Sequence, residues 1–375
     1  MFELTKEQEM LRAMVREFAD TELAPKALEL DRKGDFPFEI AKKMAALGML
    51  GISTSKELGG SGMGHLAGTI AIEELARVYP SVAFFMEVST GPLYAITNFG
   101  SVEQKKKYAP LILKGEKIMC FAATEPSGGS ELANLGTEAV PTGEGYIING
   151  RKVYITGGGI ADYCVLLAKT GDRASIFLIE QGTPGFTVGR RQEQIGLKAV
   201  DVSELAFNDC KIPKENIIGK EGAGFPIAMT TFTVARPAIG AIGLGIARGA
   251  FEIALKYAKE RILYGKPIAR LQAIQLLLAD MDTEIDAARW LVYAPGAALD
   301  KGATPRDIVK QSSRAKTVGA EVGFSVTRKA IEILGGNGVS PEYHLGRLLN
   351  DAVELIPATG TQQIMKIIQA GEILK

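Results

Sequence analysis

The spacing of apolar residues changes twice along this chain of 375 residues. From Met10 to Leu23 it follows a helical period, behind a capping box formed by Thr5 and Gln8. Near residue 118 it gives way to short apolar runs separated by Gly and Pro, which are typical of strands, and from Gly224 the helical period returns. We therefore expect an α+β fold with three domains, which are an N-terminal helical domain over 1–117, a middle β-barrel over 118–224 and a C-terminal four-helix bundle over 225–375.

The same patterns predict individual elements. Asn149-Gly150 lies between two apolar runs and predicts a β-hairpin with a type I′ turn. Pro110 predicts a break in a helix that Gly115 ends. The other expected strands cover 165–168, 175–180, 186–188 and 203–207. The expected helices cover 39–47, 66–78, 104–114, 225–258, 271–299, 305–334 and 345–374.

The charge balance and the scarcity of certain side chains disfavour several classes of protein. Lys plus Arg and Asp plus Glu both number 43, so the basic excess of nucleic-acid-binding proteins is missing. Three widely spaced cysteines and two histidines leave little material for a disulfide framework, a metal site or a Ser-His-Asp triad. The most apolar stretch, from Pro237 to Ala247, is shorter than the ~18 residues of a membrane span, and charged residues begin at Glu3. We expect a soluble, cytoplasmic protein without a metal.

Five segments resemble, in order and spacing, the flavin-dependent acyl-CoA dehydrogenases. They are Phe121–Ser130, Tyr154–Gly158, Gly219–Phe225, Arg261–Ile268 and Leu334–Gly336, and the resemblance extends over essentially the whole chain. It implies an N-terminal helical domain, a middle β-barrel and a C-terminal four-helix bundle, usually assembled as a homotetramer. It also implies FAD as the cofactor, an acyl-CoA thioester as the substrate and an electron-transfer flavoprotein as the electron acceptor.

The resemblance assigns the cofactor contacts residue by residue. Thr124 and Ser130 resemble the loop that meets the flavin ring and the pyrophosphate, and Tyr154 stands where the family commonly has Trp. Arg261 and Tyr264 resemble the Arg and the aromatic residue that meet the pyrophosphate and the adenine. The full set of expected cofactor-binding residues is Phe121, Thr124, Gly129, Ser130, Tyr154, Thr156, Arg261, Tyr264, Gln272, Gly335, Gly336 and Thr361.

The positions that usually carry the catalytic base hold no carboxylate. In most members of the family the base is the Glu of a Tyr-Glu-Gly-Thr run, but here the run is Ala358-Thr359-Gly360-Thr361. In other members the base precedes a characteristic Arg, but here Ala235 precedes Arg236. The Thr359 hydroxyl cannot act as an ionised base at neutral pH, although its backbone N–H can still polarise the thioester carbonyl. The substrate contacts that the resemblance implies are Ser130, Phe232, Arg236, Ala358 and Gly360.

Glu87 is the leading candidate for a relocated base. It lies in the apolar segment Ala83–Gly91, which corresponds to the helix that lines the acyl pocket, and burial there would raise the pKa of its carboxyl. Asp351 and Glu354 are weaker candidates. Moving the base changes the carbon that loses its proton. The pattern therefore resembles dehydrogenases of cyclic, unsaturated thioesters such as cyclohex-1-ene-1-carboxyl-CoA, which form a diene by 1,4-elimination.

Three other interpretations are open. A branch of the family without the base cleaves a sulfinate from a CoA thioester and resembles this chain around Ala95–Ser101, but Ser81–Phe85 has no cation to hold the sulfinate. A non-catalytic flavoprotein would keep the acyl-CoA pocket and lose the chemistry. A dehydrogenase of straight-chain thioesters would need a carboxylate at one of the two usual positions.

Overall fold

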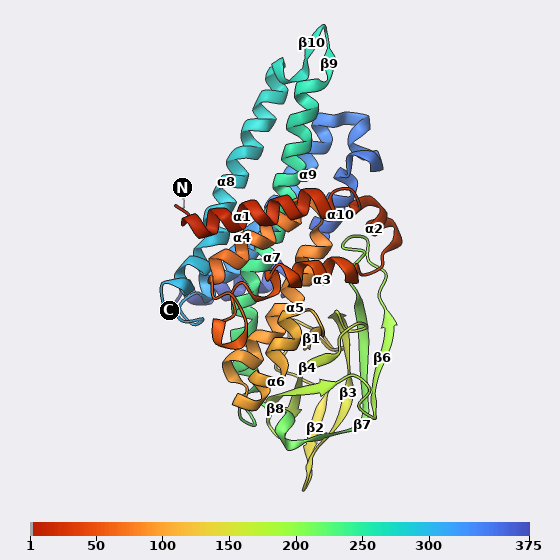
Figure 1. Ribbon diagram of the computed structural model, residues 1–375, viewed down its shortest axis with the longest axis vertical. Helices are drawn as coiled ribbons and strands as arrows, with labels where there is room; N and C mark the ends of the chain where they lie inside the picture. Colours follow the sequence, from red (N-terminus) through yellow and green to blue (C-terminus); the bar gives the residue numbers. More distant parts are fainter. Residues whose placement is uncertain (1–2) are drawn as a thin grey trace.

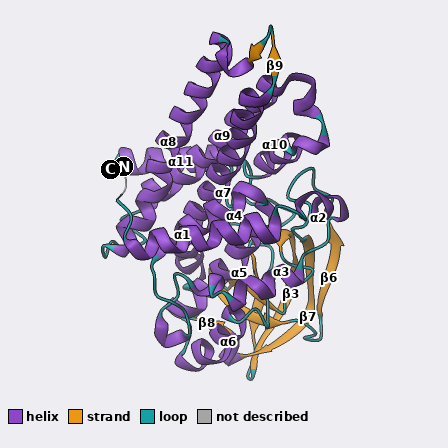
Figure 2. Cartoon of the chain, turned by 45° about the horizontal axis from the view of Figure 1, so that its top comes forward, coloured by secondary structure: helices purple, strands orange, loops and turns teal. Residues whose placement is uncertain are grey.

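Helices and strands occupy separate regions of the computed structural model, which describes residues 3–375 (Figures 1 and 2). The Thr5 hydroxyl accepts a hydrogen bond from the Gln8 N–H at 3.2 Å, and the Gln8 side chain accepts one from the Thr5 N–H at 3.1 Å, which confirms the predicted capping box. The N-terminal helices are α1 (Lys6–Phe18), α2 (Ala27–Lys33), α3 (Phe38–Ala46), α4 (His65–Val78), α5 (Pro80–Phe99) and α6 (Val102–Leu113).

One eight-stranded sheet forms the middle of the chain, in the order β6-β7-β3-β2-β4-β5-β8, with β1 paired to β4. Its strands are β1 (Met119–Ala122), β2 (Glu138–Pro141), β3 (Gly145–Thr156), β4 (Tyr163–Thr170), β5 (Arg173–Glu180), β6 (Phe186–Arg191), β7 (Val202–Pro213) and β8 (Ile217–Ile218). Within residues 3–375 no pairing joins β6 to β8, so the sheet is open and the predicted closed barrel is wrong. Closure needs paired edges along the barrel, and β8 offers only two residues.

Strand β3 replaces the predicted hairpin at Asn149-Gly150. The strand continues without a turn from Gly145 to Thr156 and pairs with β7 on both sides of these two residues. Gly150 lies at a shift in register, with φ of 150°, and a β-carbon on it would lie 2.5 Å from the Thr137 Oγ1. The glycine therefore serves a bulge and the close approach of Thr137, and not a turn.

The C-terminal helices are α7 (Gly224–Glu260), α8 (Gln272–Asp300), α9 (Val309–Leu334), α10 (Leu345–Glu354) and α11 (Gln362–Ile373). The predicted helix over 345–374 is thus two helices, because Pro357 and Gly360 interrupt it. The predicted break at Pro110 does not occur, because this proline lies in the last turn of α6. The carbonyl that loses its helical partner belongs to Lys106, and this residue is exposed to water. The hairpin of β9 (Ile262–Leu263) and β10 (Lys266–Pro267) projects beyond α7 and α8 at the top of Figure 1.

Helices α7 and α9 approach so closely that only glycine fits between them. A β-carbon on Gly240 would lie 2.4 Å from the Ala315 carbonyl oxygen, and one on Gly243 would lie 2.0 Å from the Gly319 carbonyl oxygen. By length and composition α7 could cross a membrane, which its apolar stretch in the sequence did not indicate, but 67% of that segment is buried inside the protein. The helix is the centre of the bundle, and α4, α5, α8 and α9 pack against it.

We expect Gly243→Ala to lower the free energy of unfolding by about 2 kcal/mol or more, because the added methyl group overlaps a backbone carbonyl of α9. Gly371→Ala is the matched control, because a β-carbon on this α11 residue meets no atom within 4 Å. Alanine there should raise the free energy of unfolding by up to about 1 kcal/mol. Urea unfolding measures both variants, and equal effects would contradict the close approach of α7 and α9.

Candidate active site

One turn of α7, residues 232–236, contacts three different parts of the chain. The ring centroid of Phe232 lies 4.9 Å from that of Phe121 on β1. Ala235 lines a cavity whose wall is also formed by residues of α5. The positive charge of Arg236 lies near enough to Lys316 of α9 to lower the pKa of that lysine. The turn therefore joins the strand expected to meet the cofactor, the helix expected to line the acyl pocket, and the C-terminal bundle.

A cavity of about 80 Å³, which is large enough to admit water molecules, lies between α4, α5, α7 and α8. Leu50, Ile72 and Met86 form apolar parts of its wall. Glu87 of α5 contributes a carboxyl to it, and among the residues that the structure describes no lysine or arginine lines it. The cavity can hold a neutral, mainly apolar group beside one acidic side chain.

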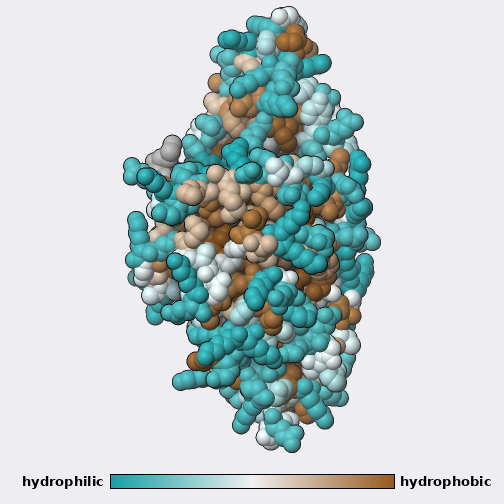
Figure 3. Space-filling view, viewed as in Figure 1, coloured by the Kyte–Doolittle hydropathy of each residue, from teal (hydrophilic) through white to brown (hydrophobic). Residues whose placement is uncertain are grey.

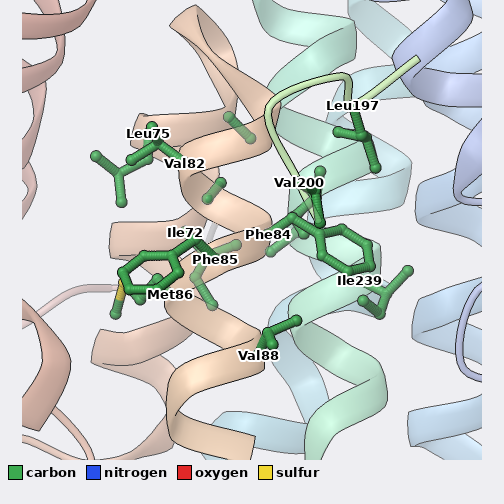
Figure 4. Close-up of a cluster of buried hydrophobic side chains, with 14 of the residues drawn as sticks. Ile72, Leu75, Val82, Phe84, Phe85, Met86, Val88, Leu197, Val200 and Ile239 are labelled. Carbon is green, nitrogen blue, oxygen red and sulfur yellow. The ribbon is translucent and has the colours of Figure 1, made fainter. Parts of the chain in front are cut away.

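The Glu87 carboxyl is buried and has no partner. The residue is 9% exposed, and within the described part of the chain no donor or cation pairs with its oxygens. Its neighbours Phe84 and Val88 lie among the apolar side chains of Figure 4, and burial raises the pKa of Glu87 to about 8. Its Oε1 lies 2.8 Å, and the Ala235 Cβ 3.9 Å, from the point that a β-carbon on Gly91 would occupy. The carboxyl thus fills the space that Gly91 leaves beside Ala235, the second usual position of the base.

The connection between α10 and α11 carries Thr359. Thr359 has φ of 53° and Gly360 has φ of 109°, so two successive residues are left-handed. Lys316, which is fully buried on α9, donates a hydrogen bond to the Ile356 carbonyl at 2.7 Å and so holds the start of this connection. The Thr361 side chain caps the N-terminus of α11. Half-buried Ala358 packs against the main apolar cluster, so the connection is fixed at both ends.

Lys316 and Arg236 are two buried cations without a counter-ion. Arg236 is 5% exposed and its Nε has no hydrogen-bond partner. Burial lowers the pKa of Arg236 to about 10, and burial together with the charge of Arg236 lowers the pKa of Lys316 to about 8. Across residues 3–375 no carboxylate forms an ion pair with either side chain. Negative charge that develops near the Thr359 connection is therefore stabilised.

The two weaker candidates for the base hold the backbone instead. Asp351 is fully buried and accepts a hydrogen bond from the Leu197 N–H at 2.6 Å. Glu354 accepts one from the Ile195 N–H at 3.2 Å. Both carboxylates tie α10 to the loop before β7, and neither lines the cavity.

The first group of expected cofactor residues gathers at the end of β1. The Thr124 carbonyl accepts a hydrogen bond from the Val153 N–H at 2.9 Å, which places the loop after β1 beside Tyr154. Tyr154 is 67% exposed and has φ of 56°. A β-carbon on Gly129 would lie 3.1 Å from the Thr124 Cγ2. The remaining members of this group are half-buried Phe121, half-buried Thr156 and exposed Ser130.

A buried ion pair holds the loop after β1. The Lys152 Nζ lies 2.8 Å from the Glu125 Oε1 and donates a hydrogen bond to the Ala123 carbonyl at 3.0 Å. Glu125 also accepts hydrogen bonds from the N–H groups of Gly136 at 2.6 Å and Thr137 at 2.9 Å. The carboxylate thereby joins both ends of the loop that carries Gly129 and Ser130 to β3.

The second group of expected cofactor residues lies away from β1, which is in the middle part of the molecule in Figure 1. Its members are all exposed and belong to the β9–β10 hairpin and the nearby ends of α8 and α9, at the top of Figure 1. Tyr264 is 89% exposed with φ of 51°, and apolar atoms of the hairpin reach the surface at this tip (Figure 3). One chain therefore does not bring the two groups together. The second group comprises Arg261, Tyr264, Gln272, Gly335 and Gly336.

Sequence reasoning missed Lys152, Glu125 and Lys316 as residues that shape the site. A signal exists for both lysines. Lys152 is in strand phase with buried Ile148, and Lys316 is in helical phase with the small buried residues 312, 319 and 323 of α9. A lysine on the apolar face of an element needs a specific acceptor, and the structure supplies one in each case.

Sequence models of three acyl-CoA dehydrogenase domains match the chain, with the N-terminal domain over residues 5–116, the middle domain over 120–210 and the C-terminal domain over 222–374. The chain belongs to the acyl-CoA dehydrogenase family. It is 42% identical over 381 residues to the short-chain specific acyl-CoA dehydrogenase of Clostridium acetobutylicum, with 100% of both chains covered. It is 38% identical over 380 residues to cyclohex-1-ene-1-carbonyl-CoA dehydrogenase of Geobacter metallireducens, again with 100% of both covered. A solved chain described as electron transferring flavoprotein of Acidaminococcus fermentans is 37% identical, with full coverage of both chains and a TM-score of 0.97.

An acyl-CoA dehydrogenase is an FAD-dependent oxidoreductase that acts on CH–CH groups, and the residues present fit that cofactor. The rings of Tyr154 and Tyr264 are exposed, and both residues adopt a left-handed backbone conformation that non-glycine residues rarely keep without a functional reason. If FAD is bound as the family resemblance implies, Arg261 would hold the pyrophosphate, and the hydroxyls of Thr124 and Thr156 would bind the polar edge of the flavin.

We expect Lys152→Met in this acyl-CoA dehydrogenase to lower the free energy of unfolding by about 3–5 kcal/mol and to weaken FAD binding, because Glu125 would stay buried without its cation. The double variant Glu125→Gln/Lys152→Met should recover most of the stability, since no charge is then buried. Urea unfolding and the dissociation constant of FAD measure the two effects. Equal losses in the single and double variants would contradict the role of the pair.

Proposed function

We propose that this acyl-CoA dehydrogenase uses Glu87 as its catalytic base and desaturates a cyclic, already unsaturated acyl-CoA such as cyclohex-1-ene-1-carboxyl-CoA. The observation that carries the proposal is the position of the Glu87 carboxyl, which is buried without a partner on the cavity wall beside Ala235. Thr359 and Ala235, at the two usual positions of the base, carry no carboxylate. The similarity to cyclohex-1-ene-1-carbonyl-CoA dehydrogenase over the whole chain supports this substrate class.

The proposed reaction follows from the position of the base on α5, where it meets a carbon that is farther from the thioester than the α-carbon. A double bond conjugated to the thioester transmits its acidifying effect to the γ-carbon, so Glu87 removes a proton there and the C–H electron pair forms a new double bond. The Thr359 N–H holds the thioester oxygen, and the positive charges of Arg236 and Lys316 favour the negative charge that develops on it. When bound, FAD accepts the hydride that leaves another ring carbon.

The other interpretations lack a matching feature among the described residues. A sulfinate-cleaving enzyme needs a cation in the acyl pocket, and no lysine or arginine lines this cavity. Straight-chain dehydrogenases of the family usually carry their base at the position of Thr359 or of Ala235, and neither residue is a carboxylate. A non-catalytic flavoprotein would not need an unpaired carboxyl in an apolar wall, which costs stability whenever it ionises.

The assembly belongs to the same proposal. The second group of cofactor residues lies at the end of the chain that carries the β9–β10 hairpin, away from the first group near β1. We therefore expect a second copy to complete each FAD site, in the cytoplasmic homotetramer that the family resemblance implies. An electron-transfer flavoprotein would be the electron acceptor. The similarity to the caffeyl-CoA reductase-Etf complex subunit CarC of Acetobacterium woodii, at 36% identity over 381 residues, supports that partner.

Glu87→Gln should lower kcat with cyclohex-1-ene-1-carboxyl-CoA by about 10²-fold or more, because the amide cannot accept the proton. Steady-state turnover with an artificial electron acceptor measures this loss. Glu180→Gln is the control. This exposed carboxylate at the end of β5 pairs with Lys107 of α6 and does not line the cavity. Activity of Glu87→Gln within a few-fold of the wild type would remove Glu87 from the mechanism.

The pH profile gives a second readout of the same prediction. Burial raises the pKa of Glu87 to about 8, and only the ionised form is a base, so kcat/KM should rise about tenfold per pH unit below pH 8 and level off above it. Lys316 titrates in the same range, because its pKa is lowered to about 8. If Glu87 is the titrating group, the Lys316→Met variant should keep the midpoint of the pH profile of kcat/KM. If that midpoint disappears, the titration belongs to Lys316.

Thr359→Glu, combined with Ala358→Tyr if the single change is insufficient, should introduce desaturation of butyryl-CoA between Cα and Cβ. It restores a carboxylate at the usual position of the base, on a connection whose backbone is already fixed by Lys316. Thr359→Gln is the control, because glutamine has the size of glutamate but cannot act as a base. Flavin bleaching by butyryl-CoA under anaerobic conditions measures the gain, and rapid bleaching of the wild type by butyryl-CoA would contradict the proposed substrate class.

A further inference from the structure

The cavity that holds Glu87 ends in polar side chains. Along α5, Glu87, Thr90 and Tyr94 occupy successive turns of the face that lines the cavity, and His65 at the start of α4 lines the same wall. The ring centroids of His65 and Tyr94 lie 6.4 Å apart. Tyr94 is about 10 Å beyond Glu87 along the helix axis, at about 1.5 Å per residue. A group that reaches past Glu87 therefore meets a phenol and an imidazole.

Neither polar group has a partner within the protein. Within residues 3–375 neither the Tyr94 hydroxyl nor the His65 ring forms a hydrogen bond, whereas the backbone N–H of His65 donates to the Asp300 carboxylate at 2.6 Å. Burial lowers the pKa of His65 and raises that of Tyr94, so both are neutral near pH 7. Half-buried hydrogen-bonding groups that face a cavity without partners are able to bind a polar group of a ligand.

Gly91 lies between Glu87 and Tyr94 on the face of α5 that lines the cavity and places no side chain between them. Side chains on a helix lean toward its N-terminus, so Tyr94 leans over the turn that contains Thr90 and Gly91. A side chain on Gly91 would collide with the Glu87 carboxyl. The Thr90 hydroxyl is already bound to the Met86 carbonyl at 2.8 Å, so it does not compete for the ligand.

We propose that the acyl group of the substrate carries a hydroxyl or oxo substituent on the ring carbon farthest from the thioester, and that Tyr94 and His65 recognise it. This inference rests on the proposed function, since it assumes that the ring occupies the cavity beside Glu87. The substituent is neutral, because no lysine or arginine of the described residues lines the cavity to balance a charge there. Tyr94 and His65 are specificity residues in this proposal and take no part in proton removal.

The test compares the dissociation constants of cyclohexanecarboxyl-CoA and 4-hydroxycyclohexanecarboxyl-CoA, measured by equilibrium dialysis with the FAD-loaded enzyme. The wild type should bind the hydroxylated thioester at least tenfold more tightly. Tyr94→Phe, which removes only the hydroxyl, should reduce the ratio to threefold or less, and His65→Leu should reduce it as well. Tyr108→Phe is the control and should keep the wild-type ratio, since the Tyr108 hydroxyl hydrogen-bonds Glu180 far from the cavity lining.

Two results would overturn the inference, namely a wild-type ratio below threefold or a ratio that Tyr94→Phe leaves unchanged. The binding test needs no turnover, so it is separate from the proposed function. If neither cyclohex-1-ene-1-carboxyl-CoA nor its 4-hydroxy derivative bleaches the flavin while the tenfold ratio stands, the proposed reaction is wrong and the polar recognition holds. If both bleach it at equal kcat/KM and the binding ratio is below threefold, the reaction holds and the recognition is wrong.

Discussion

The contact between α7 and α9 is the constraint on which the rest of the site depends. Four glycines, Gly240, Gly243, Gly319 and Gly323, let the two backbones approach to distances at which a β-carbon would overlap a carbonyl group. This approach fixes the height and rotation of α7 within the bundle. The turn 232–236 then presents Phe232 to β1, Ala235 to α5 and Arg236 to the neighbourhood of Lys316. Small residues in one seam thus set the geometry of the adjacent cavity, since Gly240 follows Arg236 by about one helical turn.

The proposed site combines a supported backbone at Thr359 with a carboxyl on another helix. Thr359 has a left-handed backbone, and Lys316 donates a hydrogen bond to the Ile356 carbonyl at the start of the same connection, although the side chain of Thr359 is not acidic. The carboxyl lies instead on α5, in a gap that Gly91 leaves, where apolar neighbours raise its pKa. A raised pKa near 8 keeps most of the carboxyl protonated at neutral pH, which limits the cost of burying it. The same burial makes the ionised form a stronger base, so the chemistry and the stability of α5 are coupled.

The order of helices, sheet and helices followed from periodicity, and the capping box at Thr5 was correct in detail. The errors arose where tertiary contacts override local signals. Asn149-Gly150 has the composition of a turn but serves a bulge against Thr137, and the barrel does not close because β8 is too short. For the site, the absence of carboxylates at Thr359 and Ala235 was readable from the sequence. The support of the loops by Lys152 and Lys316 was not predicted, because each depends on backbone carbonyls that come close only in the folded chain.

The two buried cations Arg236 and Lys316, which have no counter-ion, affect how easily a substrate bound beside them can lose a proton. Both side chains are nearly inaccessible to solvent, and no acidic residue of the described chain offsets them. Water does not screen charges in such a place, so the electrostatic potential there is strongly positive. Restoring an acid at residue 359 would cancel much of that potential, whereas threonine leaves it intact. In the proposed reaction, these two charges act on the thioester as a fixed electric field, and the Glu87 carboxylate receives the proton.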